Sequence, residues 1–236
     1  MKLIGERRAL ASSVLIFYAF LYALVAIASP LPEWMPAYLA LASVYALGFF
    51  AVVAGYFWAR WYAIGVSLFG AISAAVGMWQ MGPEPLLLIL GGSHLFIAVA
   101  LSGESMQGPF EGQEQWRLRF HMDDHAVRRL GRSVMRAAFG LPYVLLYALA
   151  PKPGNALVFA AAMLAVAGVA GLVRLRTWSV FALGGAGVAM AVGGVMAMAS
   201  GTGCSVGFAP LAGALIFTTA VTPFAAPLAR ALRGPA

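Results

Sequence analysis

The residues from Ala9 to Ala28 read ALASSVLIFYAFLYALVAIA and contain no charged side chain. A helix needs about 20 predominantly apolar residues to cross the hydrocarbon core of a bilayer, and this stretch has that length. A secretory signal peptide would carry a shorter apolar core and a small-residue cleavage site. We therefore interpret the stretch as a retained transmembrane helix.

The whole chain has the composition that such helices require. It is 62% hydrophobic and 10% charged, with a mean hydropathy of +0.88, whereas a soluble domain is about 45–50% apolar and about 25% charged. Apolar runs that break at charges, prolines and glycines predict the spans 9–28, 36–58, 61–81, 85–101, 134–150, 156–173, 177–199 and 207–229. The predicted fold is an all-α polytopic membrane bundle of about eight transmembrane helices.

Basic residues indicate the orientation, because cytoplasmic loops carry the excess of Lys and Arg. With these spans the basic residues fall on one side of the membrane, and Lys152 is the exception. Both termini are therefore expected in the cytoplasm. The chain divides into a first membrane half 1–101, a cytoplasmic amphipathic loop 102–135 and a second membrane half 136–236. The excess of Arg over Lys is typical of a GC-rich bacterial genome, so we expect a bacterial inner membrane.

A faint internal repeat relates the two membrane halves. The sequence LYAL at 21–24, near the end of the first span, recurs at 146–149 near the end of the fifth. Arg60-Trp61 has a counterpart in Arg176-Thr177-Trp178. Two parallel four-helix repeats would then be related by an axis along the membrane normal. Chance similarity between apolar helices is the alternative explanation.

The residues missing from the spans exclude several classes of protein. His94 is the one ionisable side chain well inside a predicted span apart from tyrosines and Cys204. This disfavours a carrier that uses intramembrane carboxylates. Three histidines are too few for a di-iron cluster, and no lysine lies where retinal would need one. No GxxxxGK[ST] phosphate loop is present, and we expect neither a cofactor nor direct contact with nucleic acid.

The sequence Gly91-Gly92-Ser93-His94 in the fourth span allows two interpretations. As a packing position, its glycines let a neighbouring helix approach, and Ser93 and His94 form hydrogen bonds across the interface. Alternatively, His94 with Ser93 contacts a ligand or acts as a pH-sensitive switch. Neighbouring residues on a helix point about 100° apart, so Ser93 and His94 are not a nucleophile and its base by proximity alone.

A second candidate site lies in the predicted loop. On a helix, His121 and His125 share one face with Asp124 beside them, which suits two or three ligands of a divalent metal such as Zn²⁺. The signal is weak because no further cysteine or histidine completes the ligand shell.

The same loop predicts a contact surface. The segment 113–136 has the pattern of an amphipathic helix at the membrane surface. Residues expected to contact lipid headgroups or a protein partner are Trp116, Arg128, Arg129 and Arg132.

We expect a non-catalytic regulator, sensor or complex subunit, whose basic loop contacts a cytoplasmic protein. An anti-sigma-like role belongs to this class. The alternative is a transporter or channel for a neutral or apolar small solute, with its site near His94 and the Thr-rich last span. A lipid-modifying enzyme has least support, because the spans do not supply an acid, a base and a nucleophile. Glycine-rich faces in the sixth and seventh spans are compatible with an oligomer or a larger complex.

Overall fold

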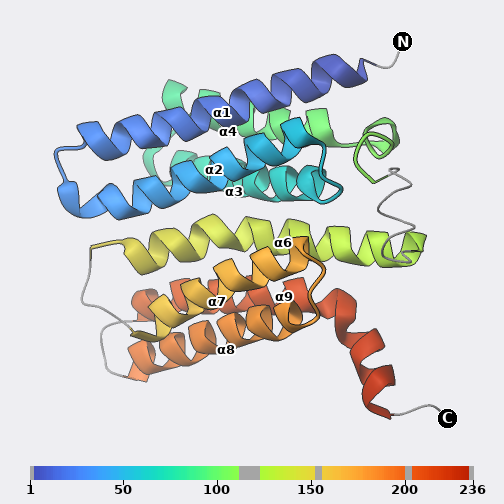
Figure 1. Cartoon of the computed structure of the whole chain (residues 1–236). Helices are drawn as coiled ribbons and strands as arrows, with labels where there is room; N and C mark the ends of the chain where they lie inside the picture. Colours follow the sequence, from blue (N-terminus) through green and yellow to red (C-terminus); the bar gives the residue numbers. More distant parts are fainter. Residues whose placement is uncertain (1–2, 112–122, 152–155, 200–203, 234–236) are drawn as a thin grey trace. The chain divides into compact units, whose positions relative to one another are not determined.

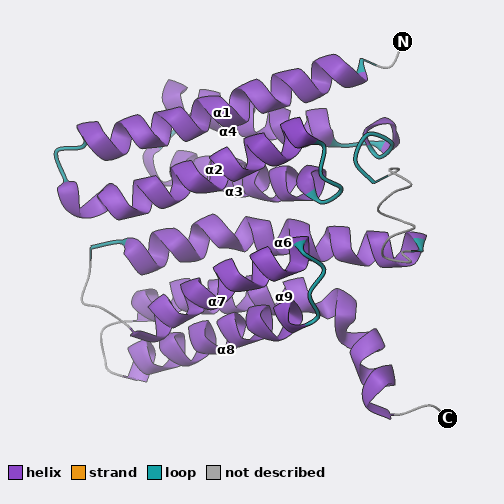
Figure 2. Ribbon diagram, in the orientation of Figure 1, coloured by secondary structure: helices purple, strands orange, loops and turns teal. Residues whose placement is uncertain are grey.

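The computed structural model describes residues 3–111, 123–151, 156–199 and 204–233, and its regular structure there is helical throughout (Figure 2). The long helices are α1 (Ile4–Ala28), α2 (Met35–Ala54), α3 (Ala59–Met81), α4 (Pro85–Leu101), α6 (Asp124–Leu149), α7 (Ala156–Val173), α8 (Trp178–Ala199) and α9 (Cys204–Arg233). Two short 3-10 turns, η1 (Pro32–Trp34) and η2 (Glu104–Met106), lie before α2 and after α4.

Most of the long helices can cross a membrane. Six qualify by length and composition within the described residues: α1, α2 with η1, α3, α7, α8 and the part of α9 from Gly207 to Ala226. At about 1.5 Å per residue, the 17 residues of the apolar helix α4 fall slightly short of the roughly 30 Å hydrocarbon core. Helix α6 is longer, with 26 residues, and begins in a charged stretch. The predicted fold class is confirmed: the chain is an all-α, multi-pass membrane protein.

Several helix boundaries differ from those predicted; α1, for example, begins at Ile4 rather than at 9, and α9 ends at Arg233 rather than at 229. Helix α2 ends at Ala54 rather than at 58, because Gly55 adopts a left-handed conformation with φ 73°. Helix α6 begins at Asp124 rather than at 134. Its charged first turns are strongly amphipathic and continue directly into the apolar part. The last residues of the predicted loop therefore belong to the same helix as the fifth span.

The chain folds as two compact units, and each contains four long helices. Unit 1 is Met1–Asp123 with Leu149–Pro151, and unit 2 is Asp124–Ala148 with Lys152–Ala236. In unit 1, α1 and α3 each pack against both α2 and α4, which closes a ring of four helices (Figure 1). The largest fully buried side chains of this ring include Leu15, Tyr45, Tyr62, Ile97 and Leu101.

In unit 2, α8 packs against both α7 and α9. Hydrogen bonds join α6 to α9: Ser133 Oγ donates to Ala220 O at 2.7 Å, and the Tyr143 hydroxyl donates to Ala209 O at 2.5 Å. Leu183, Met190 and Phe217 are fully buried. The first helix of each unit thus contacts the last helix of the same unit.

Arginines of α1 bind the carboxyl ends of neighbouring helices. Arg7 donates to Ala100 O at 2.9 Å and to Ser102 O at 2.6 Å, and Arg8 donates to Val52 O at 2.9 Å and Val53 O at 2.7 Å. These carbonyls lie at or just beyond helix ends, where intrahelical donors run out. The ends also carry partial negative charge. A guanidinium group therefore stabilises them both by its hydrogen bonds and by its positive charge.

Arg136 of α6 makes a similar contact in unit 2. Its Nη1 donates to Thr219 O at 2.7 Å and to Thr222 Oγ1 at 2.9 Å on α9. Pro223 has no N–H, so Thr219 O lacks the donor that a regular helix would supply four residues later. Arg136 of α6 and the Thr222 hydroxyl, which donates to Thr219 O at 2.8 Å, together replace the hydrogen bond that the proline removes.

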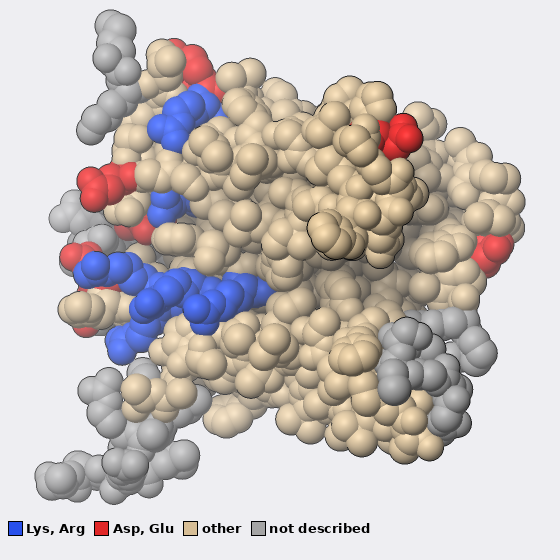
Figure 3. All heavy atoms as spheres, turned by 180° about the vertical axis from the view of Figure 1, so that it is seen from behind, with Lys and Arg blue, Asp and Glu red and all other residues tan. Residues whose placement is uncertain are grey.

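In both units the basic side chains gather at one end of the helices (Figure 3). Arg7 and Arg60 lie where α1 and α3 begin in unit 1, and Arg129 and Arg176 lie at the start of α6 and before α8 in unit 2. This distribution has the asymmetry that the positive-inside rule describes.

Candidate functional site

The polar interior of unit 1 is organised around His94 on α4. Its side chain is fully buried, and both ring nitrogens have partners: Nδ1 lies 2.7 Å from Leu90 O, and Nε2 lies 2.6 Å from the Tyr45 hydroxyl. Because a carbonyl oxygen accepts only, Nδ1 must donate to Leu90 O. In the neutral imidazole Nε2 then accepts from Tyr45 on α2. No ring nitrogen is left for a metal or ligand in this arrangement.

Tyrosines of α1 and α2 surround the imidazole. The Tyr18 ring lies 4.1 Å from the His94 ring, centroid to centroid, and Tyr45 stacks on Tyr22 at 5.4 Å. The Tyr18 hydroxyl lies 2.5 Å from Ser93 Oγ, which also approaches Ile89 O at 2.7 Å. Ser93 and His94 therefore both form hydrogen bonds to other helices, Ser93 to α1 and His94 to α2.

Gly70 on α3 provides the space for the imidazole. A Cβ atom at Gly70 would lie 2.1 Å from His94 Cδ2 and 2.3 Å from Nε2, closer than any real contact. Gly91 of α4 faces the next turn of α3, where the Cβ of Ala74 lies 3.2 Å from the position of an added Cβ. Small residues thus bring α3 and α4 together around one large polar side chain.

Unit 2 also packs a glycine against a large side chain between its last two helices, but the glycine and the large side chain have exchanged helices. There the glycine is on the last helix, α9: a Cβ at Gly213 would lie 2.4 Å from Met190 Cε of α8 and 3.2 Å from Tyr143 Cε1 of α6. Tyr143 matches Tyr18 at the offset of the LYAL repeat, and each hydroxyl faces a backbone carbonyl of the last helix, Tyr18 at 3.5 Å from Leu90 O. Met190 replaces the imidazole as the side chain that fills the space.

These matched contacts favour the internal repeat, which remains a prediction. They also distinguish the units chemically. Unit 1 places an imidazole, a serine hydroxyl and two phenols together, whereas the corresponding position of unit 2 is filled by a thioether. The candidate site is therefore a feature of unit 1 rather than of the four-helix arrangement itself.

The candidate metal site falls partly outside the described residues. His121 is not described, while Asp124 and His125 lie exposed in the first turn of α6. Within the described ranges, no group of three His, Cys, Asp or Glu side chains is placed to hold a metal ion. The metal assignment remains a weak prediction.

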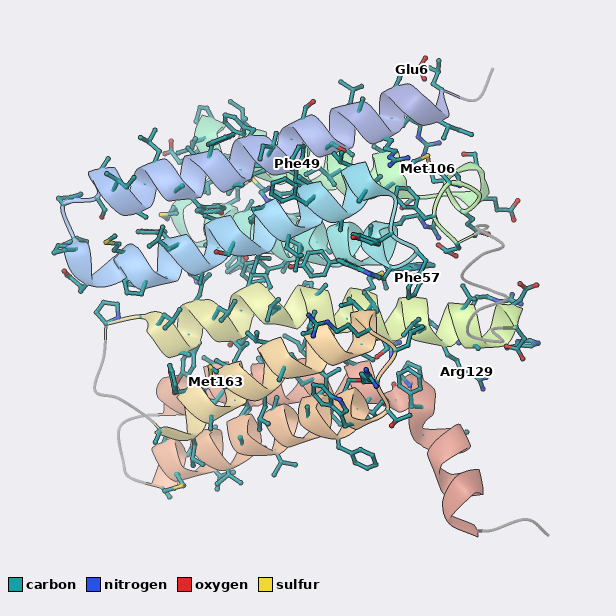
Figure 4. The ribbon with its side chains drawn as sticks, in the orientation of Figure 1. Glu6, Phe49, Phe57, Met106, Arg129 and Met163 are labelled. Carbon is teal, nitrogen blue, oxygen red and sulfur yellow. The ribbon has the colours of Figure 1, made fainter. Side chains whose placement is uncertain are left out.

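The candidate contact surface is described in part. Trp116 lies outside the described residues, whereas Arg128 and Arg132 are exposed on α6 and Arg129 is half-buried (Figure 4). Arg128 Nε donates to Asp124 O at 3.2 Å. Among the described residues, Arg129 and Arg132 have no hydrogen-bond or ion-pair partner. Their guanidinium groups are free to bind an external anion.

One polar contact of unit 1 has no signal in the sequence. Arg60 Nε donates to Glu111 Oε1 at 2.7 Å, and the two side chains are only 3% and 7% exposed. Arg60 also donates to Gly103 O at 3.2 Å, while Phe110 and Met106 of the same segment are fully buried (Figure 4). The residues after α4 therefore fold back as a cap on unit 1. The pattern of charges predicted only that Arg60 lies on the cytoplasmic side.

Comparison of the chain with protein-family models, curated proteins and solved structures found no match.

Proposed function

We propose that the protein is a non-catalytic regulator, sensor or complex subunit of a bacterial inner membrane, with both termini in the cytoplasm. Its basic surface, defined as Arg128, Arg129 and Arg132 on α6, binds a cytoplasmic protein. The surrounding bundle holds this surface at the membrane.

The observation that supports the proposal is that some arginines of the chain form hydrogen bonds within their own unit, whereas those of the basic surface leave most of their donors unpaired in the described part of the chain. Arg7, Arg8, Arg60 and Arg136 each donate to backbone carbonyls of their own unit. The basic surface keeps most of its hydrogen-bond donors unused among the described residues. A guanidinium offers five donors in a planar fork that matches carboxylates, so an acidic partner surface is the chemical complement.

Helix α6 is suited to display this surface. Its apolar face is buried through Leu130, Val134 and Ala137, while Arg128 and Arg132 are exposed one turn apart. The helix continues without a break into its apolar second part, whose residues such as Ala138, Leu141 and Val144 are buried inside unit 2. A partner bound to these arginines would therefore be held on a rigid element.

A photo-cross-linking residue at position 132 of the full chain, expressed in its own cells, tests the proposal. We expect one discrete adduct with an acidic cytoplasmic protein, weakened by salt because the contact is ionic. The same cross-linker at Phe181, which is 68% exposed on the apolar part of α8, is the control and should give no protein adduct. Neutralising the other two arginines of the basic surface, by Arg128→Gln with Arg129→Gln in the chain that carries the cross-linker, should abolish the adduct.

The transporter alternative predicts a different outcome. Purified protein in liposomes would then support flux of a neutral solute without any partner, and the triple variant Arg128→Gln, Arg129→Gln and Arg132→Gln, without a cross-linker, would leave that flux unchanged. Flux with no adduct at position 132 would contradict the proposed function.

A further inference from the structure

The turn between α7 and α8 has a counterpart in unit 1, and the two differ in charge. In unit 1, Gly55 is left-handed, and Tyr56 N donates to Ala51 O at 3.2 Å. In unit 2, Leu175 takes the same place with φ 58°, and Arg176 N donates to Gly171 O at 2.8 Å. Both turns are Schellman motifs, which join consecutive helices in the same way.

The arginines of these turns have different surroundings. Arg60, just after the unit 1 turn, is buried and paired with Glu111 of the cap. Arg174 and Arg176 flank Leu175 and are both exposed. Among the described residues no acceptor or acidic group pairs with either guanidinium. Two positive charges are thus left uncompensated at the end of unit 2.

Exposed aromatic residues follow this turn, in the pattern of a membrane interface. Trp178 directly follows the turn and is 49% exposed, and Phe181, almost one helical turn further along α8, is 68% exposed. The Trp178 ring lies over Gly171, where an added Cβ would be 3.0 Å from its Cη2. Its indole N–H has no partner among the described residues. Exposed tryptophan next to an apolar helix is typical of the membrane interface, so the two arginines lie at headgroup depth.

We propose that the segment Arg174–Trp178 binds the phosphate group of an anionic phospholipid. The guanidinium groups of Arg174 and Arg176 pair with the phosphate oxygens, and the Trp178 ring packs against the glycerol and upper acyl region. Charge complementarity and depth both favour a lipid over a soluble protein. The matching turn of unit 1 offers no such site among the residues that the structure describes there, because the cap supplies Glu111 as an internal anion for Arg60.

Native mass spectrometry of the full chain in neutral detergent measures this binding directly. Phosphatidylglycerol and phosphatidylcholine with the same acyl chains are titrated separately. We expect phosphatidylglycerol to bind more tightly, and Arg174→Gln with Arg176→Gln to weaken it about 30-fold, the usual effect of two basic residues at an anionic surface. Leu175→Gly keeps both charges and suits the left-handed conformation, so its affinity should be close to wild type.

The matched control removes two charges elsewhere on unit 2, by Arg230→Gln with Arg233→Gln near the end of α9. This variant should retain phosphatidylglycerol, whereas equal losses in both double variants would overturn the site. Equal binding of phosphatidylcholine would also overturn it, as would displacement of the lipid by inorganic phosphate, which would indicate a site for free phosphate. A discrete protein adduct from a photo-cross-linker at position 176 would assign the turn to a protein partner instead. Because Arg174 and Arg176 are not in the basic surface of α6, failure here leaves the proposed function standing.

Discussion

The His94 imidazole occupies the space that Gly70 leaves open on the facing helix. A Cβ atom at Gly70 would lie 2.1 Å from His94 Cδ2, and the ring cannot simply swing aside, because Tyr45 and Leu90 hold its two nitrogens. Glycine at this position therefore serves a close approach, since the helical backbone of α3 does not require it.

Gly70→Ala should destabilise the protein by about 1–3 kcal/mol, the usual cost of overpacking a well-filled interior. Thermal unfolding in detergent measures this. Gly92→Ala is the matched control: nothing lies within 4 Å of its added Cβ, and alanine favours a helix by up to about 1 kcal/mol over glycine. A Gly70→Ala protein as stable as wild type would show that the imidazole can move without loss.

Placing the large side chain on α3 and the glycine on α4 tests whether unit 1 can adopt the packing of unit 2. Gly70→Met with His94→Gly copies the arrangement of Met190 and Gly213. We expect the double variant to be clearly more stable than the sum of the two single changes, because residues in contact couple by roughly 0.5–3 kcal/mol. The same unfolding assay on all four proteins gives the coupling energy. Additive losses would mean that the two units do not share one packing scheme.

His94→Gln separates packing from function. If His94 is a packing residue, thermal stability and the yield of the partner adduct at position 132 should fall together and mildly, since an interhelical hydrogen bond in membranes averages about 0.6 kcal/mol. This is the outcome we expect, because both ring nitrogens already have protein partners. Tyr45→Phe removes the same hydrogen bond from the other side and should match it. A His94→Gln protein with normal thermal stability that no longer gives the partner adduct would instead assign His94 to a ligand or a pH-sensitive switch.

The sequence predicted the all-α membrane fold and named His94 as a candidate site residue, but it did not predict the partners of His94. Apolar run length and charge placement are local properties, so helices such as α3 and α8 follow from them directly. Tyr45 and Gly70 come from two other helices, and no spacing in the chain relates them to position 94. Arg60 is a similar case, because its burial depends on Glu111, which a long-range fold brings beside it.

Topology gives an independent test of the membrane arrangement. Reporter fusions after Arg60 and Arg176 and at the C-terminus should report cytoplasm, because each unit gathers its basic side chains at one end of its helices and cytoplasmic loops carry the excess of Lys and Arg. Fusions near Glu33 and Glu84 should report the opposite side. An external C-terminus would exclude an even number of spans, and with it the parallel repeat.

The cap on unit 1 depends on the ion pair between Arg60 and Glu111. Both side chains are buried, so Glu111→Ala leaves an uncompensated guanidinium and should cost about 3–5 kcal/mol, as for other buried pairs broken on one side. Glu104→Ala, an exposed change in the same segment, should cost little. Thermal unfolding gives the stabilities, and labelling of a cysteine placed at Met106, which is fully buried in wild type, reports whether the cap has opened.

Arg60→Met with Glu111→Leu removes both charges and should recover most of the loss, because a buried ion pair contributes little net stability over apolar residues of similar size. Unchanged labelling at position 106 in the Glu111→Ala protein would mean that Phe110 and the backbone contacts hold the cap without the ion pair.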